Sequence, residues 1–161
     1  MKILLVLFSL VPLAIAYYRL SSAIDPIKML YTYTGIGAIV LLLLSLLPST
    51  LRRLFKLNLL PYRKTLGLLS FVYTTLHLAV FIVFDSEFDW VSIVEKSLKK
   101  PFIYIGFIAF ITFLAMALTS TKKLFARFAK YHKVVYIALI SGLIHSTMAQ
   151  KVAGIDRKSV V

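Results

Sequence analysis

Residues 66–84, LGLLSFVYTTLHLAVFIVF, decide the fold of this chain. The stretch contains no Asp, Glu, Lys or Arg, and its apolar residues run on without the period of a strand or of an amphipathic helix. An uncharged block of about 17 to 25 residues is what a helix needs to cross a hydrocarbon layer of about 30 Å. We therefore predict a transmembrane helix here, with His77 inside it.

The rest of the chain repeats this pattern. Hydrophobic residues make up 60% of the 161 residues and charged residues only 16%, which excludes an ordinary soluble domain. We predict an all-α integral membrane protein, a single transmembrane domain over residues 1–161, with about five transmembrane helices. The helices after the first form a four-helix core. The expected spans are residues 3–18, 29–47, 66–84, 101–119 and 134–150.

The distribution of charge orients the chain. The net charge is +13, but the basic residues bracket the apolar blocks instead of forming one stripe, so membrane topology explains them better than nucleic-acid binding. Connections 48–64 and 120–133 contain basic residues and no acid, whereas the other side holds every Asp and Glu. The positive-inside rule therefore places these connections and the N-terminus in the cytoplasm and the C-terminus outside.

The first block has two interpretations. Lys2, the apolar run to Ile15 and the small residues around it resemble a cleavable signal peptide, with residues 1–16 removed. Tyr17, Tyr18 and Arg19 instead form the interfacial anchor of a first transmembrane helix, which is the interpretation we prefer. Both interpretations place the chain that follows this block on the outer side of the membrane.

Histidine carries the candidate chemistry. The chain has no cysteine, which excludes iron–sulfur clusters and thioether-attached haem, and it has three histidines. His77 and His145 lie equally far along two blocks that run in the same direction, so we expect them at similar depth in the outer half of the membrane. A haem iron takes one nitrogen from each of two neighbouring helices, and this pair is suited to b-type haem.

His132 and two cations define a second, inner level. His132 precedes His145 by 13 residues, or about 20 Å along a helix, and Arg63 and Lys64 stand at the matching level before His77. The layout predicts one or two haems, the inner one held by His132. Residues 13 apart are about 140° out of phase on a helix, so His132 must approach from a turn before the helix, or the helix must bend. Arg63 and Lys64 either neutralise haem propionates or only anchor the cytoplasmic side.

Rival interpretations remain open. A haem-free scaffold or small transporter also fits, with histidines that are merely hydrogen-bonded between helices. Gly35-Ile36-Gly37 lies inside an apolar block, so we expect close helix packing rather than a nucleotide fingerprint. The stretch Leu124–Phe128 is expected to lie on the inner membrane surface, and Trp90 is expected at the membrane interface.

Short motifs along the chain resemble a known family. They are Asp25-Pro26-Ile27-Lys28, Arg63-Lys64-Thr65-Leu66-Gly67-Leu68, Leu76-His77-Leu78, Lys100-Pro101-Phe102-Ile103, Leu118-Thr119-Ser120-Thr121, Tyr131-His132, Val135-Tyr136 and Ile144-His145. Their order and spacing, from about residue 25 to residue 151, are similar to those of the MsrQ family, formerly YedZ. These are haem-binding membrane subunits of a protein-methionine-sulfoxide reductase system within the ferric-reductase-like transmembrane superfamily, which includes the NADPH oxidases.

The resemblance implies a function. It implies that His77, His132 and His145 are haem ligands, with Arg63 at the position of a first histidine in the NADPH oxidases. It also implies an electron-transfer subunit in the bacterial inner membrane rather than the catalytic subunit. Electrons come from a cytosolic flavin reductase or from the quinone pool, with FMN or quinone as a further cofactor, and pass to a periplasmic molybdopterin methionine-sulfoxide reductase. Longer members have a sixth helix, for which this sequence holds no further apolar block.

Overall fold

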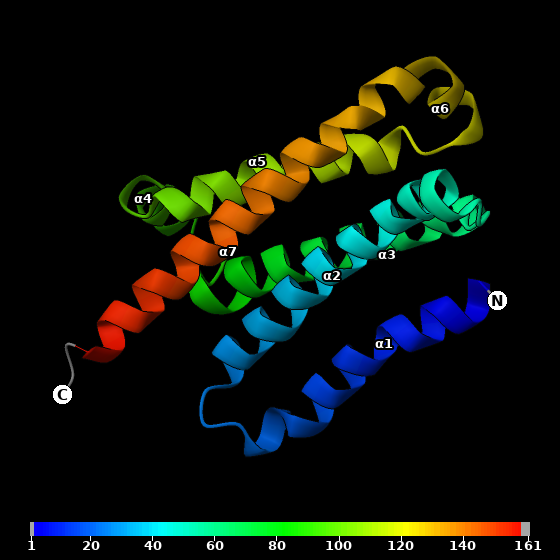
Figure 1. Cartoon of the computed structure of the whole chain (residues 1–161). Coiled ribbons are helices and arrows are strands. Elements are labelled where there is room, and N and C mark those ends of the chain that lie inside the picture. The colour runs from blue at the N-terminus through cyan, green and yellow to red at the C-terminus, as the bar shows by residue number, and fades with distance from the viewer. Residues whose placement is uncertain (1, 159–161) are drawn as a thin grey trace. The chain divides into compact units, whose positions relative to one another are not determined.

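The computed structural model describes residues 2–158, and helices make up nearly all of that part of the chain (Figure 1). No strand occurs among these residues, as the sequence predicts. In chain order the elements are α1 (Lys2–Arg19), the 3₁₀ turn η1 (Leu20–Ser22), α2 (Pro26–Phe55), α3 (Leu60–Val80), the π-helical turn η2 (Phe81–Asp85), α4 (Trp90–Lys99), α5 (Pro101–Leu118), α6 (Lys122–Phe128), the 3₁₀ turn η3 (Ala129–Val134) and α7 (Val135–Lys158).

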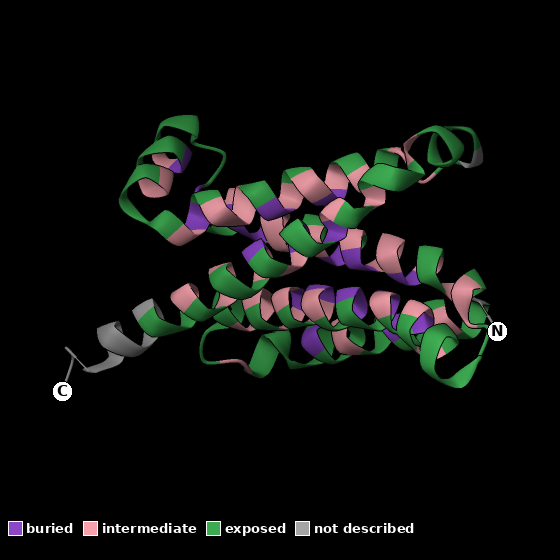
Figure 2. Cartoon of the chain, turned by 45° about the horizontal axis from the view of Figure 1, so that its top comes forward, coloured by how far each residue is buried: buried purple, intermediate pink, exposed green. Residues whose placement is uncertain are grey.

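Within the described residues, four helical segments are long and apolar enough to cross a bilayer. They are Ile3–Ser22, Pro26–Phe55, Leu60–Asp85 and Pro101–Leu118. Much of the described chain is exposed or half-buried (Figure 2), and many of the exposed residues are large and apolar. Several buried side chains are small hydroxyls such as Ser45 and Ser70. Lipid covers apolar surface, and small polar residues suit contacts between membrane helices. The all-α, multi-pass membrane protein is thus confirmed; the fifth predicted span, residues 134–150, falls in α7 and stays a prediction.

Helix ends follow local chemistry more than hydropathy. Asp25 caps α2, because its carboxylate accepts the Lys28 amide at 2.9 Å, and Pro26 occupies the first helical position. At its other end α2 continues past the predicted end of the apolar span to Phe55, and Lys56 closes it with φ of 56°. The helix outlasts the span because Leu51–Phe55 still favours helix after the residues become basic.

The first compact unit extends to Phe88 and contains α1, α2 and α3. In it α2 and α3 form an antiparallel hairpin (Figure 1), joined across the interface by the Ser70 hydroxyl, which donates to the Ala38 carbonyl at 2.7 Å. Tyr73 is 2% exposed and its hydroxyl donates to the Ser9 carbonyl of α1. A Cβ at Gly37 would lie 2.3 Å from the Tyr73 ring, so the close packing predicted for this glycine is confirmed.

The second compact unit begins at Asp89 and contains α4 to α7. Here α5 and α7 lie side by side and antiparallel, with α4 at one end of the pair and α6 at the other (Figure 1). Ala109 and Phe113 of α5 are buried, as are Val135 and Ala138 of α7. The segment predicted to be amphipathic, Leu124–Phe128, is indeed helical and belongs to α6. Its position on the membrane surface stays a prediction.

Candidate functional site

His77 projects from α3 against the N-terminal third of α2. Its Nδ1 lies 3.2 Å from the Thr34 hydroxyl oxygen, and its ring meets the edge of Tyr31 with centroids 5.3 Å apart. A Cβ built on Gly35 would lie 3.1 Å from Cε1 of the imidazole. The imidazole is therefore packed directly onto α2 at a point where only a glycine leaves room without adjustment.

The Thr34 contact fixes which nitrogen of His77 carries the proton. Thr34 donates its single hydroxyl hydrogen to the Leu30 carbonyl at 2.6 Å. The Thr34 oxygen is then an acceptor, so Nδ1 of His77 must be the donor. In the neutral imidazole this assignment puts the lone pair on Nε2, the nitrogen that a metal ion would bind.

His145 has the same arrangement in the other unit, with different chemistry. Its Nδ1 lies 2.6 Å from the backbone carbonyl of Phe102 on α5, and a carbonyl can only accept, so Nδ1 again carries the proton. The Phe102 ring is tilted over the imidazole with centroids 5.8 Å apart. A Cβ on Gly106 would lie 2.8 Å from Nδ1, closer than real Cβ contacts allow.

The two histidines thus share one design. Each sits over a glycine of the preceding long helix, and each directs Nδ1–H to an acceptor 43 residues earlier in the chain. A second hydrogen bond of this kind, which sets the tautomer and ring orientation, accompanies nearly all metal-binding histidines. Two neutral imidazoles with lone pairs on Nε2 are a donor set that suits a haem iron. Because His77 and His145 belong to different units, their pairing stays a prediction.

His132 differs from the other two. It lies in η3, a 3₁₀ turn that precedes α7, so it does approach from outside the α-helix. Its Nε2 lies 3.2 Å from the hydroxyl oxygen of Thr119, whose hydrogen goes to the Ala115 carbonyl at 2.7 Å. In this contact Nε2 is the donor and Nδ1 keeps the lone pair. Thr119 follows Gly106 by 13 residues, which puts His132 about 20 Å from His145 along α5.

Arg63 and Lys64 lie near the start of α3, at the end of the α2–α3 hairpin that is remote from His77. Both are exposed, and the Arg63 guanidinium donates to the Ser49 hydroxyl of α2 at 3.0 Å. Fourteen residues separate Arg63 from His77, or about 21 Å along α3. Both cations thus lie about two thirds of the length of α3 from the imidazole, and their role at an inner level stays a prediction.

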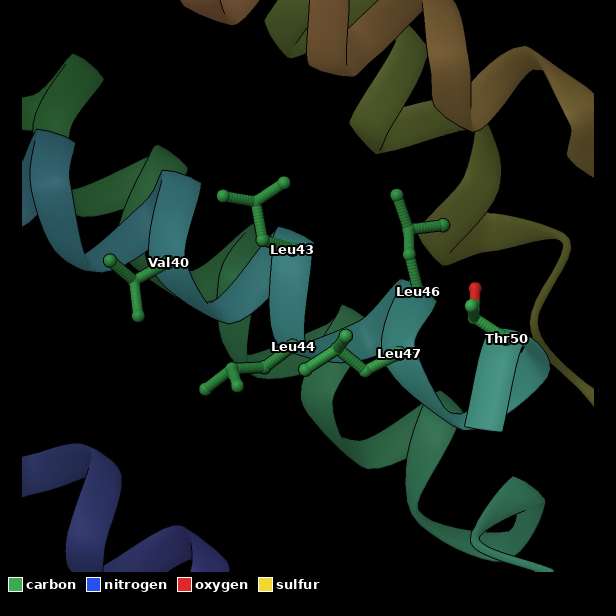
Figure 3. A pocket seen from close by; sticks show the side chains of 6 residues that line it. All are labelled: Val40, Leu43, Leu44, Leu46, Leu47 and Thr50. Atoms are coloured by element: carbon green, nitrogen blue, oxygen red, sulfur yellow. The ribbon is translucent and has the colours of Figure 1, made fainter. Parts of the chain in front are cut away.

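An apolar groove on α2 lies outside this arrangement of histidines. Figure 3 shows its lining, which comes from one face of α2: Val40, Leu43, Leu44, Leu46, Leu47 and Thr50. Its volume is about 380 Å³, and none of the lining side chains is titratable. Among the described residues no three His, Asp or Glu side chains gather into a metal cluster.

Sequence reasoning missed the partners of the histidines. Thr34 and Gly106 carry a weak signal, since a hydroxyl and a glycine inside apolar helices are both unusual enough to suggest a packing role. Gly67 and Gly142 carry the same signal, yet a Cβ on either meets nothing within 4 Å. The acceptor for His145 is the backbone of Phe102, which leaves no mark in a sequence at all.

Comparison with known proteins gives a consistent result. The model of the family described as "Ferric reductase like transmembrane component" matches residues 28–143. The MsrQ haem-binding subunit of the protein-methionine-sulfoxide reductase of Agrobacterium fabrum is 38% identical over 131 residues, which cover 79% of this chain and 61% of the relative. The corresponding subunit of Brucella anthropi is 37% identical and that of Brucella ovis 36%, each over 79% of this chain and 60% of the relative. The chain thus spans about three fifths of the length of these curated relatives. No solved structure matches it.

Proposed function

The chain belongs to the ferric-reductase-like transmembrane family, and on that basis we propose that it is a haem b-binding electron-transfer subunit. In this proposal it takes electrons from a cytosolic flavin reductase or from quinol and delivers them to a periplasmic, molybdopterin-containing methionine-sulfoxide reductase. The observation that carries the proposal is the shared placement of His77 and His145, each of which directs Nδ1 at an oxygen of the preceding long helix, so that Nε2 is the nitrogen that would bind a metal.

The proposed ligands are His77 and His145. Haem, when bound, supplies one-electron redox chemistry. The Thr34 hydroxyl and the Phe102 carbonyl orient the two imidazoles, and the apolar spans exclude water around them. Each histidine packs against the N-terminal third of a helix that is expected to begin on the outer side of the membrane. This supports a similar depth in the membrane for the two imidazoles, which a shared iron requires.

An inner haem position is the second part of the proposal. His132 is its proposed ligand, and with the observed Thr119 contact the nitrogen with the lone pair is Nδ1. Arg63 and Lys64 belong to the same inner level, where they neutralise propionates or anchor the cytoplasmic side; their exposure is compatible with either role. The number of haems is therefore one or two. FMN or quinone binding belongs to the donor side of the same proposal.

The test begins with the purified full chain and its absorption spectrum. We expect the difference bands of b-type haem on reduction, and we expect His77→Ala and His145→Ala to lose most of that haem. Thr75→Ala and Thr147→Ala are matched controls, since each exposed hydroxyl lies two residues from a proposed ligand and bonds only within its own helix. A colourless protein that takes up no haemin favours the haem-free scaffold or transporter instead. Full haem in both histidine variants overturns the ligand assignment.

The proposed location is the bacterial inner membrane, with the N-terminus in the cytoplasm and the C-terminus in the periplasm. Since the chain has no cysteine, a single introduced cysteine reports on one position only. Leu57→Cys, in the α2–α3 connection, should resist a membrane-impermeant thiol reagent in intact cells, and Glu87→Cys, before α4, should react. The opposite pattern inverts the topology without bearing on the haem ligands.

A further inference from the structure

Helix α4 is expected at a membrane boundary because it directly precedes the apolar span of α5 in the chain. It ends at Lys99, and the apolar span of α5 begins at Pro101. A single residue, Lys100, separates the two, and its amide still bonds to the Lys96 carbonyl at 2.9 Å. The C-terminal end of α4 must therefore lie where α5 enters the hydrocarbon layer. By the positive-inside rule this boundary is expected on the outer side of the membrane.

The two faces of α4 are unlike. Ile93 is only 8% exposed and lies on the side that packs against α5. Beside Ile93 the helix carries an exposed apolar stripe at helical spacing, with Trp90 70%, Val91 74%, Val94 58% and Leu98 79% exposed. Exposure of so much apolar surface to water on a helix of ten residues is unfavourable in free energy. Such a surface marks a site of contact with a membrane or another protein.

The charges beside the stripe indicate what covers it. Lys96, Lys99 and Lys100 lie at the C-terminal end of α4, where the acid beside them is Glu95, whose pKa is lowered by its hydrogen bond and ion pair with Lys99. Asp89 lies at the other end of the helix as its N-cap. The C-terminal end of α4 is thus cationic even with the Lys99–Glu95 pair formed. An apolar face that carries tryptophan, next to a polar face rich in lysine, is typical of helices that lie in the membrane interface and favour anionic lipids.

We propose that α4 is an interfacial helix whose partner is the outer leaflet of an anionic phospholipid bilayer. The stripe Trp90, Val91, Val94 and Leu98 inserts among the upper acyl chains, and the lysines at the C-terminal end of α4 lie at the level of the phosphates. This inference concerns the lipid surface alone and stands apart from the haem proposal, because no ligand histidine takes part in it.

The test uses Trp90, which is the one tryptophan in the chain and therefore the only source of indole fluorescence. The full protein is reconstituted into phosphatidylcholine vesicles with and without phosphatidylglycerol. We expect blue-shifted emission that is quenched by lipid brominated near the headgroup and protected from iodide in the water. Phosphatidylglycerol should increase both effects, and the Lys99→Gln, Lys100→Gln double variant should lose that increase, whereas Lys123→Gln, in α6, should keep it.

Two results overturn the proposal. Emission typical of water with ready iodide quenching means that the stripe stays solvated. Emission that neither iodide nor brominated lipid quenches means that protein covers the stripe, either a second copy or a partner. Both are read on the unmodified chain, so they do not depend on whether a variant folds, and haem content measured on the same sample keeps the result separate from the proposed function.

Discussion

Gly106 offers the sharpest perturbation of the candidate site, because replacing it with alanine shifts the proposed ligand His145 while leaving that residue unchanged. The new Cβ would lie 2.8 Å from Nδ1 and 2.9 Å from Cε1 of His145, whereas ordinary contact begins at 3.4 Å. The imidazole must therefore retreat by at least about 0.6 Å, the difference between these distances, in a packed interior that resists such movement. That retreat strains the 2.6 Å hydrogen bond to the Phe102 carbonyl.

The cost can be placed on a scale. Overpacking of this kind costs about 1–3 kcal/mol. If displacement of the His145 ring relieves the overpacking, haem binding should lose the same free energy, which corresponds to a roughly 5- to 150-fold weaker affinity for haem. Gly35→Ala makes a 3.1 Å contact with His77 and needs only a few tenths of an ångström, so its effect should be smaller. Gly142→Ala and Gly67→Ala meet nothing within 4 Å and should bind haem normally.

The assay is titration of the apo-protein with haemin in detergent, followed by absorbance, with thermal unfolding of the same samples. The expected order of haem affinity is Gly142→Ala and Gly67→Ala at the level of the unmodified chain, then Gly35→Ala, then Gly106→Ala. The two controls should also be as stable as the unmodified chain or more so, since alanine favours helix over glycine by about 1 kcal/mol. Unchanged affinity in Gly106→Ala, or equal losses in all four variants, refutes the role assigned to this contact.

Three further changes test other contacts. Thr34→Val removes the acceptor for Nδ1–H of His77 and should make the haem midpoint potential more positive, because the imidazole becomes a weaker donor to ferric iron. Thr34→Ser should return the potential to that of the unmodified chain, and an equal potential in Thr34→Val and the unmodified chain refutes the role of this contact. Tyr73→Phe removes the hydrogen bond from the Tyr73 hydroxyl to the Ser9 carbonyl and should lower the free energy of unfolding by about 1 kcal/mol, while Tyr17→Phe, at an 82% exposed position, serves as the unaffected control in the same thermal melts. His132→Ala should remove the inner haem and leave the outer one, as counted by extracted haem per protein; an unchanged count removes the inner position.

Much of the fold follows from the sequence because lipid imposes a simple rule. Uncharged blocks of sufficient length must be helical, so the spans could be located directly. The helices themselves extend beyond these blocks: α2 continues to Phe55 beyond residue 47, and α3 begins at Leu60 ahead of residue 66. Hydropathy marks where the hydrocarbon ends, whereas backbone hydrogen bonding continues until a residue such as Lys56 changes conformation.

Helix α4 shows what the same rule overlooks. Apolar and charged residues lie on different faces of this helix. Its ten residues are too few to span the membrane, and only Trp90 stands out in the sequence, as an interfacial anchor. The helix is stabilised by packing of Ile93 against α5 and by the Asp89 carboxylate, which accepts the Val91 amide at 3.0 Å. The cap was visible in the sequence, whereas the packing depends on tertiary structure.

The candidate site divides in a similar way. The three histidines could be selected from sequence because an imidazole is costly in lipid and needs a reason to be there. Their partners could not, because a partner depends on the rotation of one helix against another, which periodicity does not supply for segments that are apolar on all sides. Thr34 and Thr119 look alike in the sequence, yet one accepts from Nδ1 of its histidine and the other from Nε2.

That difference between nitrogens separates His77 and His145, which could bind a metal through Nε2, from His132, whose Nε2 is in the contact with Thr119. His77 and His145 need only keep their present tautomer, which contacts inside their own helical hairpins already set. The bond from His145 to the Phe102 carbonyl, at 2.6 Å, is shorter than the 3.2 Å bond from His77 to Thr34, so the His145 ring should be held more firmly in its orientation. His145 is also the proposed ligand whose acceptor no side-chain substitution removes. Under the proposal, the haem potential should therefore respond to substitution of Thr34, on the His77 side, and should have no comparable adjustment on the His145 side.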